Sequence, residues 1–298
     1  MESKYHFEYD KVYFKELISY SGWNLFGSVA TMVRGQGNNI ILNLFFGTVV
    51  NASYGLTSQV QNAVSMFVSN FQMALNPQIV KSYAKGDLKQ NHQLIFQGSK
   101  LSFFLLFVIV CPIWFNIDFI LSVWLNNIPE YTPIFIQLIL IHLLIDCISG
   151  PLMVGAQATG KIKWYQIVVG TLLFLNLPIS YLLLKVMHME PYVVFEVMIT
   201  LSLLTLFFRI FFLKRMIQLP VLAYFKKVLW PIVLISILSN ILLFFILTLI
   251  TTNSLWGTFI LRILVISFVS VGFITLLGLT KSELRFIKEI FLKKLDIK

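Results

Sequence analysis

The sequence predicts an all-α fold, a polytopic bundle of about eight transmembrane helices, and three observations support this class. Hydrophobic residues make up 58% of the 298 residues and charged residues only 12%, whereas soluble domains carry about 25% charged residues. Eight apolar runs follow one another along the chain, each near the ~20 residues that cross the hydrocarbon layer. Nearly all of the 23 Lys and Arg residues lie on alternate connections between these runs.

The apolar runs set the expected organisation of the chain. The predicted spans cover residues 20–47, 51–79, 101–125, 133–155, 164–184, 192–213, 228–250 and 255–279. We therefore predict a cytoplasmic lead-in over 1–19, a six-helix bundle over 20–216, two additional transmembrane helices over 217–279 and a basic cytoplasmic tail over 280–298. We expect Asn76-Pro77 to end the second helix, since proline disfavours helix continuation, and Gly86-Asp87 to form a turn.

The distribution of basic residues orients the chain in the membrane. They occupy both tails and the second, fourth and sixth connections, and we assign Arg209 to the sixth. The opposite connections are short and carry only Lys185. Because cytoplasmic loops are enriched in Lys and Arg, we predict a bacterial inner-membrane protein with both termini in the cytoplasm. The net charge of +10 is explained by this topology, so no nucleic-acid partner is expected.

Most spans are rich in Leu, Ile, Phe and Val on every side, but the first two carry continuous polar faces. On the first, an arc of about 140° holds Asn24, Gly27, Ser28, Thr31, Arg34, Gly35, Asn38 and Asn39. On the second, an arc of about 120° holds Asn51, Tyr54, Gly55, Ser58, Gln61, Asn62, Ser65, Ser69, Gln72 and Asn76. Lipid cannot satisfy such polar groups. We interpret the two faces as the lining of a hydrated cavity; the alternative is polar contact between helices.

Arg34 is the leading candidate for substrate binding. It lies about ten or more residues from either end of its span, and an Arg at the bilayer centre costs roughly 3 to more than 10 kcal/mol. A guanidinium in a polar cavity suits phosphate or pyrophosphate; a structural ion pair with Asp146 is the alternative. The predicted substrate-binding set is Arg34, Asn38, Asn39, Asn24, Thr31, Gln61, Asn62 and Gln72.

The fourth span carries His142 and Asp146 at i, i+4, on one face with Ser149. Intramembrane Asp and His are typical of proton or Na⁺ coupling, and a satisfied core pair is the alternative. Cys111 and Cys147 lie within spans without metal-ligand spacing, so we interpret them as packing thiols. We expect no catalytic residue, resident metal or cofactor beyond H⁺ or Na⁺ coupling.

The C-terminal tail begins with a capping-box spacing, Thr280 to Glu283. Apolar residues then recur at helical spacing among basic ones, at Leu284, Ile287, Phe291 and Leu295. This pattern is typical of a basic amphipathic helix on the lipids of the inner leaflet; an ordinary solvated tail is the alternative.

Several short motifs carry a family resemblance. They are the segments 21–27 (SGWNLFG), 35–43 (GQGNNIILN), 76–79 (NPQI), 82–87 (SYAKGD) and 158–163 (ATGKIK). Together they resemble the C-terminal half of a polysaccharide or O-antigen flippase of the MATE-like (MOP) exporter superfamily, in the Wzx-like group. The resemblance covers most of residues 15–215.

This resemblance implies a fold and a function. Such proteins have two six-helix lobes around a central cavity and work by alternating access. The first six helices here would form a C-terminal lobe, with two extra helices after it, and Arg34 would line the cavity. The implied substrate is undecaprenyl-pyrophosphate-linked oligosaccharide, flipped across the inner membrane for surface polysaccharide and lipopolysaccharide biosynthesis. A complete member has a further lobe of six helices, so we expect this chain to be the C-terminal half of a longer protein or to pair with a second polypeptide that supplies the N-terminal lobe.

Other functions remain open at this stage. One is an ion-coupled MATE-type exporter of another, anionic solute; cationic drugs are disfavoured because Arg34 would repel them. Another is a non-transporting fragment or assembly subunit. A membrane enzyme is not expected, because the sequence carries no HExxH motif, Gly-rich phosphate loop or Cys/His cluster.

Overall fold

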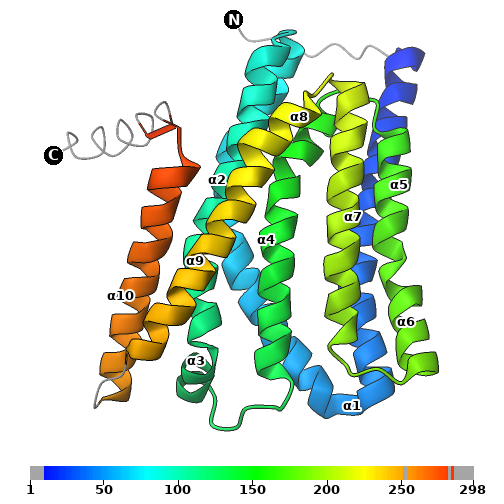
Figure 1. Cartoon of the computed structure of the whole chain (residues 1–298). Helices are drawn as coiled ribbons and strands as arrows, with labels where there is room; N and C mark the ends of the chain where they lie inside the picture. The colour runs from blue at the N-terminus through cyan, green and yellow to red at the C-terminus, as the bar shows by residue number, and fades with distance from the viewer. Residues whose placement is uncertain (1–9, 251–253, 281–282, 285–298) are drawn as a thin grey trace, which may run out of the picture.

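The computed structural model describes residues 10–250, 254–280 and 283–284, and the regular secondary structure of this part of the chain is entirely helical (Figure 1). The helices are α1 (Lys11–Ala84), α2 (Leu88–Phe115), α3 (Ile117–Trp124), α4 (Thr132–Gln157), α5 (Lys163–Phe174), α6 (Asn176–Met187), α7 (Val193–Met216), α8 (Val221–Tyr224), the π-helix η1 (Phe225–Leu229), α9 (Trp230–Leu249), α10 (Leu255–Phe273) and η2 (Ile274–Gly278). Seven helical segments among these residues are long and apolar enough to cross a membrane. The predicted all-α, polytopic class is confirmed.

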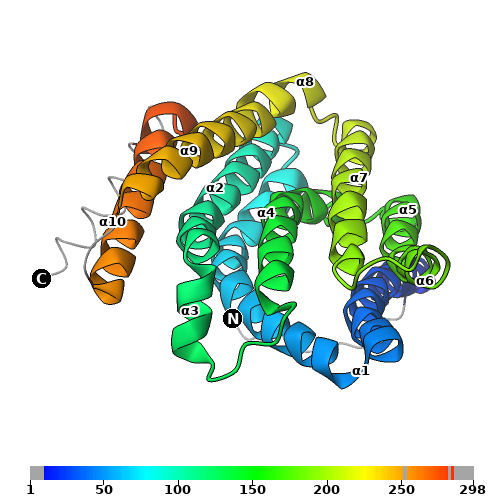
Figure 2. The same ribbon diagram turned by 60° about the horizontal axis from the view of Figure 1, so that its bottom comes forward.

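The longest helix, α1, supplies two of the predicted spans. It bends at Gly47, whose φ of 73° and ψ of −163° suit glycine because it has no Cβ. The bend divides α1 into a first arm (11–46) and a second arm (48–84), which lie on different sides of the bundle (Figure 2). Residues 11–19 of the predicted lead-in belong to the first arm, and residues 1–9 lie outside the described part.

The prediction that Asn76-Pro77 ends the second helix was wrong, because α1 continues through Pro77 to Ala84. Contacts with α2 hold the extra turns in place: Asn91 Nδ2 donates to the Ile79 carbonyl at 2.8 Å and to Ser82 Oγ at 3.1 Å. Membrane helices tolerate proline, and these contacts stabilise the turns that follow it. The turn at Gly86-Asp87 is confirmed, with Gly86 at φ 75° and Asp87 capping α2.

Two other predicted spans are each divided into two helices. The third span breaks at Asn116, between α2 and α3, and the fifth breaks at Leu175, between α5 and α6. In the fifth span Pro178 has no N–H for the Phe174 carbonyl, which accounts for the break. The Thr280–Glu283 capping box is formed by reciprocal bonds of 2.8 and 3.4 Å. The predicted tail helix over 285–298 lies outside the described residues.

Helix α4 lies at the centre of the bundle, packed against α1, α2 and α7 (Figure 1). The first arm of α1 packs on α5 and α6, while α9 and α10 lie outside α2. The start of α1, the Lys85–Asp87 turn, the α4–α5 and α7–α8 connections and the end of η2 lie at one end of the molecule, hereafter the basic end. This is the alternation that the basic connections predicted.

Candidate functional site

Four ionisable residues from three helices lie near one another in the bundle, three of them buried and Asp146 exposed to a groove. Arg34 comes from the first arm of α1, His142 and Asp146 come from α4, and Arg209 comes from α7. Each is close enough to others of the group for direct electrostatic interaction. We call these four residues the charged cluster. The alternative of an Arg34–Asp146 ion pair is not realised, because the one ion pair within 4.0 Å among the described residues joins Lys100 and Glu283.

Arg34 is buried with part of its hydrogen-bonding capacity unused. Its exposed fraction is 8%, and its Nη1 atom has no hydrogen-bond partner among the residues that the structure describes. Native proteins pair nearly all buried polar groups, so an unpartnered guanidinium N–H needs an explanation. Arg34 does not line the hollows described below, so a bound anion would reach Nη1 only after the side chains around it move.

Arg209 is a member of the cluster that the sequence analysis assigned wrongly. It does not lie in a cytoplasmic connection, because α7 continues to Met216 and buries Arg209. Its Nη1 donates to the Tyr165 hydroxyl of α5, and its guanidinium lies 5.7 Å from the centre of the Tyr165 ring. Ser202, Thr205 and Arg209 follow i, i+3, i+7 spacing. This polar stripe is the sequence signal that would have placed Arg209 in the interior.

The His and Asp of α4 have different surroundings. His142 is buried, and its Nδ1 lies 2.9 Å from Ser202 Oγ of α7, so it joins the two helices. Asp146 is exposed to a groove of about 220 Å³. The polar residues that line this groove with it come from three helices: Ser65, Ser69, Gln72, Ser149 and Arg209. No His, Cys, Asp and Glu group suited to a metal occurs in the described part of the chain.

Three of the amides predicted to bind substrate bridge helices. Asn176 Nδ2 donates to Asn38 Oδ1 at 2.6 Å, and Gln157 Nε2 donates to Asn24 Oδ1 at 3.1 Å. Gln72 Nε2 donates at 2.9 Å to both Ser102 Oγ and the Cys147 carbonyl while lining the groove. These three amides therefore agree with the alternative interpretation of the polar faces, in which polar side chains hold neighbouring helices together.

The other predicted binding residues are not gathered around the groove. Thr31 is exposed and donates to the Gly27 carbonyl within its own helix. Asn39 and Gln61 are half-buried and Asn62 is exposed, and none of them lines the groove beside Asp146. The structure therefore brings Arg34, His142, Asp146 and Gln72 to one region, together with Arg209, and spreads the rest along α1.

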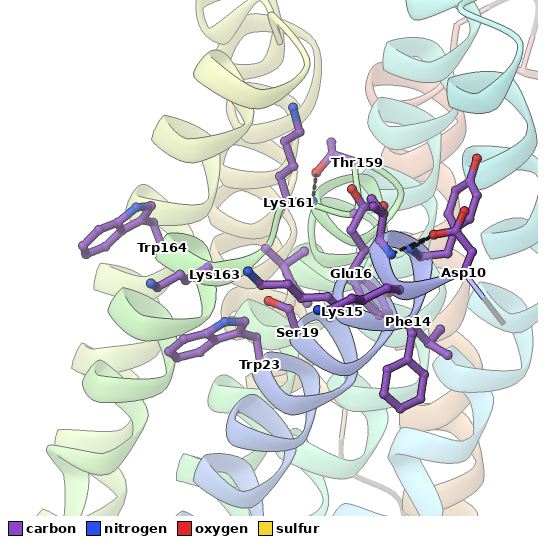
Figure 3. A pocket seen from close by; sticks show the side chains of 17 residues that line it. Asp10, Phe14, Lys15, Glu16, Ser19, Trp23, Thr159, Lys161, Lys163 and Trp164 are labelled. Atoms are coloured by element: carbon purple, nitrogen blue, oxygen red, sulfur yellow. Dashed lines mark hydrogen bonds between the residues drawn. The ribbon is translucent and has the colours of Figure 1, made fainter.

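A second hollow, of about 1360 Å³, lies at the basic end between the start of α1 and residues 159–164 (Figure 3). Lys15 approaches it from α1 and Lys161 and Lys163 from the other side, beside Trp23 and Trp164. Lys163 Nζ lies 5.6 Å from the Trp23 ring centre and 5.7 Å from that of Trp164. We call this hollow the interfacial pocket, since Lys and Trp are typical of membrane–water interfaces.

Comparison with known proteins adds one finding. A family model described as MatE matches residues 25–182, a stretch that contains residues 25–46 of the first arm of α1, all of the second arm and all of α4. Arg34, His142 and Asp146 lie inside the match and Arg209 lies beyond it. No curated protein and no solved structure matches the chain.

Proposed function

Because the chain belongs to the MatE family, whose model matches just over half of it, we propose that it flips undecaprenyl-pyrophosphate-linked oligosaccharide across the bacterial inner membrane. Membership makes the chain a multi-pass membrane transporter protein of the MOP superfamily. The lipid-linked glycan is the substrate that the chemistry of the charged cluster and the interfacial pocket supports best.

The excess of positive charge in the charged cluster carries this proposal. Arg34 and Arg209 contribute two guanidinium groups and Asp146 one carboxylate, and Arg34 Nη1 has no acceptor among the described residues. A pyrophosphate has several anionic oxygens, and guanidinium groups bind such oxygens in bidentate geometry. Arg34 is the proposed primary contact and Arg209, held by Tyr165, the second. Asp146 and His142 are the proposed sites of H⁺ or Na⁺ coupling.

The interfacial pocket supports the same substrate class. Its lysines suit a pyrophosphate, and the faces of Trp23 and Trp164 suit the C–H face of a sugar ring. The pocket lies at the basic end, which we assign to the cytoplasm by the positive-inside rule. We propose that the headgroup binds there before reaching the charged cluster, in a cavity completed by a second lobe from a partner polypeptide.

Export of another, smaller anion is the second candidate function. The groove beside Asp146 has a volume of about 220 Å³, which accommodates a small anion more readily than an oligosaccharide. Both candidate functions require Arg34. For the lipid-linked glycan the lipid and sugar parts of the ligand add to its affinity, whereas for a small anion the anionic group alone accounts for it.

A binding experiment with Arg34→Gln tests the proposal. The purified chain in lipid nanodiscs is titrated with undecaprenyl pyrophosphate, and we expect Arg34→Gln to weaken binding about tenfold or more, since charge-assisted hydrogen bonds contribute about 1.5–3 kcal/mol. Arg262→Gln is the control, because Arg262 Nη2 donates to the Leu247 and Ile250 carbonyls away from the cluster. Unchanged affinity in Arg34→Gln would contradict the site. Equal affinity for inorganic pyrophosphate would favour the small-anion exporter.

A further inference from the structure

A third hollow lies at the basic end, away from the charged cluster. Its volume is about 650 Å³, and it is bounded by α2, the α8–η1 segment with the start of α9, and residues 277–280. It shares no lining residue with the groove beside Asp146 or with the interfacial pocket. We call it the basic groove.

Positive charge dominates the lining of the basic groove. Lys89, Lys100, Lys226 and Lys227 contribute ammonium groups, against a single acid, Glu283. Lys100 is buried and paired with Glu283 at 2.7 Å. The other three lysines are exposed and form no ion pair with any described residue. Bringing three unpaired ammonium groups together is unfavourable, so the groove is suited to an anionic ligand.

The local backbone explains why the lysines meet here. Lys226 and Lys227 lie on the π-helix η1, and both are exposed on the groove although they are adjacent in sequence. Insertions of π-helix within α-helices occur frequently at functional sites. Lys89 faces them from the first turn of α2. The Lys100–Glu283 pair ties the lining residues 277–280 to α2, because Glu283 also accepts hydrogen bonds from Thr280 N and Oγ1, each at 2.8 Å.

The rest of the lining is mixed, with the polar side chains of His92, Gln93, Gln97 and Thr280 beside apolar ones. Phe96, Pro231, Leu277 and Leu279 line it beside the lysines. A site that combines basic groups with apolar side chains, at the level where the helices leave the membrane, matches a phosphate headgroup joined to acyl chains. Basic pockets between transmembrane helices on the cytoplasmic side are known binding places for acidic lipid headgroups.

We propose that the basic groove binds the headgroup of an acidic membrane phospholipid, with its phosphate among Lys89, Lys226 and Lys227 and its acyl chains along the apolar side chains. This inference does not depend on the transported substrate. It assigns a role to the lysines of η1 beyond orienting the chain in the membrane, namely to anchor the outer pair α9–α10 against α2 through a bound lipid.

Native mass spectrometry of the purified chain tests this site. Phosphatidylglycerol or phosphatidylcholine is titrated into the detergent-solubilised protein, and retained lipid is measured for wild type, Lys89→Gln/Lys226→Gln/Lys227→Gln and a control. The control, Lys81→Gln/Lys85→Gln/Arg215→Gln, removes equal charge near the same end without altering a groove residue. Since a membrane-proximal Lys or Arg contributes about 1 kcal/mol to acidic-lipid attraction, we expect the groove variant to weaken phosphatidylglycerol binding about tenfold or more.

The control is expected to weaken phosphatidylglycerol binding about twofold or less, with no change for phosphatidylcholine in either variant. Equal losses in both variants would show general surface attraction and overturn the proposal. Unchanged binding in the groove variant would overturn it as well. Displacement of phosphatidylglycerol by an equal concentration of inorganic phosphate would assign the groove to a soluble phosphate and exclude the lipid.

Discussion

The six-helix bundle (α1–α7) and the outer pair (α9–α10) use their polar side chains differently. In the bundle many of these side chains reach from one helix to another, as Asn38 does to Asn176 and His142 to Ser202, although others, such as Thr31, bond within their own helix. In the outer pair most of the bonded polar side chains return to their own helix, as Asn240 does to the Ser236 carbonyl. Arg262 is an exception, since it reaches the end of α9.

Burial is highest at the centre of the bundle. In the most apolar stretches of α2, α4 and α7 61% of residues are buried, against 28% over Val221–Leu249 and 17% over Leu255–Gly278, while the stretches of α1 and of α5–α6, at the edge of the bundle, have 22% and 33%. An apolar helix surface exposed on all sides suits lipid, whereas close packing and interhelical hydrogen bonds hold membrane bundles together. The difference teaches that the bundle is built to position polar groups, and that the outer pair is built to face lipid and depends on few specific contacts.

The largest effect is expected where the two regions are joined. The buried pair of Lys100 on α2 and Glu283 beyond η2 links them. Glu283→Leu leaves the Lys100 ammonium buried without a partner, so we expect a loss of about 3–5 kcal/mol in the free energy of unfolding. Denaturant titration in detergent measures it. The double variant Lys100→Leu/Glu283→Leu should recover much of the loss, and a double variant as unstable as the single would contradict this account.

A matched pair of glycines compares the packing of the two regions. A Cβ at Gly98 of α2 would meet Leu75 and lie 3.0 Å from Pro151 Cγ, whereas Gly272 of α10 has nothing within 4 Å. We expect Gly98→Val to destabilise the protein by about 2–3 kcal/mol through overpacking. Gly272→Val should change stability by less than about 0.5 kcal/mol. Thermal unfolding in one detergent compares them, and similar losses would contradict the division of the molecule into two regions.

The sequence was sufficient for the number and order of the spans and for the end of the molecule at which the basic connections gather, because hydropathy and charge report on span length and alternation. Helix ends were less predictable. Pro77 was expected to stop α1, but contacts from Asn91 on α2 sustain the helix beyond it. Such contacts join residues that are separate in sequence, so local proline rules cannot anticipate them.

The candidate site was predictable in its chemistry but not in its full membership. Arg34, His142 and Asp146 stand out as ionisable residues within apolar spans, and the structure places them in one cluster. Arg209 was missed, because it lies near Lys214 and Arg215 and was grouped with them. Periodicity separates faces of a helix but does not say which face meets another helix. For that reason the polar stripes did not distinguish Asn24 and Asn38, which bridge helices, from residues lining a groove.

The smallest of these effects should come from a buried amide pair. Asn38→Leu removes the acceptor of Asn176 Nδ2 and leaves that amide buried without it. Hydrogen bonds between membrane helices contribute about 0.6 kcal/mol on average and up to about 1.7, so we expect a loss of about 1–2 kcal/mol. Asn240→Leu, on the exposed face of α9, should cost close to zero because its amide bonds only within its own helix. Denaturant titration of both variants compares the regions directly. If Asn240→Leu were the more costly change, the outer pair would depend on polar contacts as the bundle does, and its assignment as a lipid-facing addition would fail.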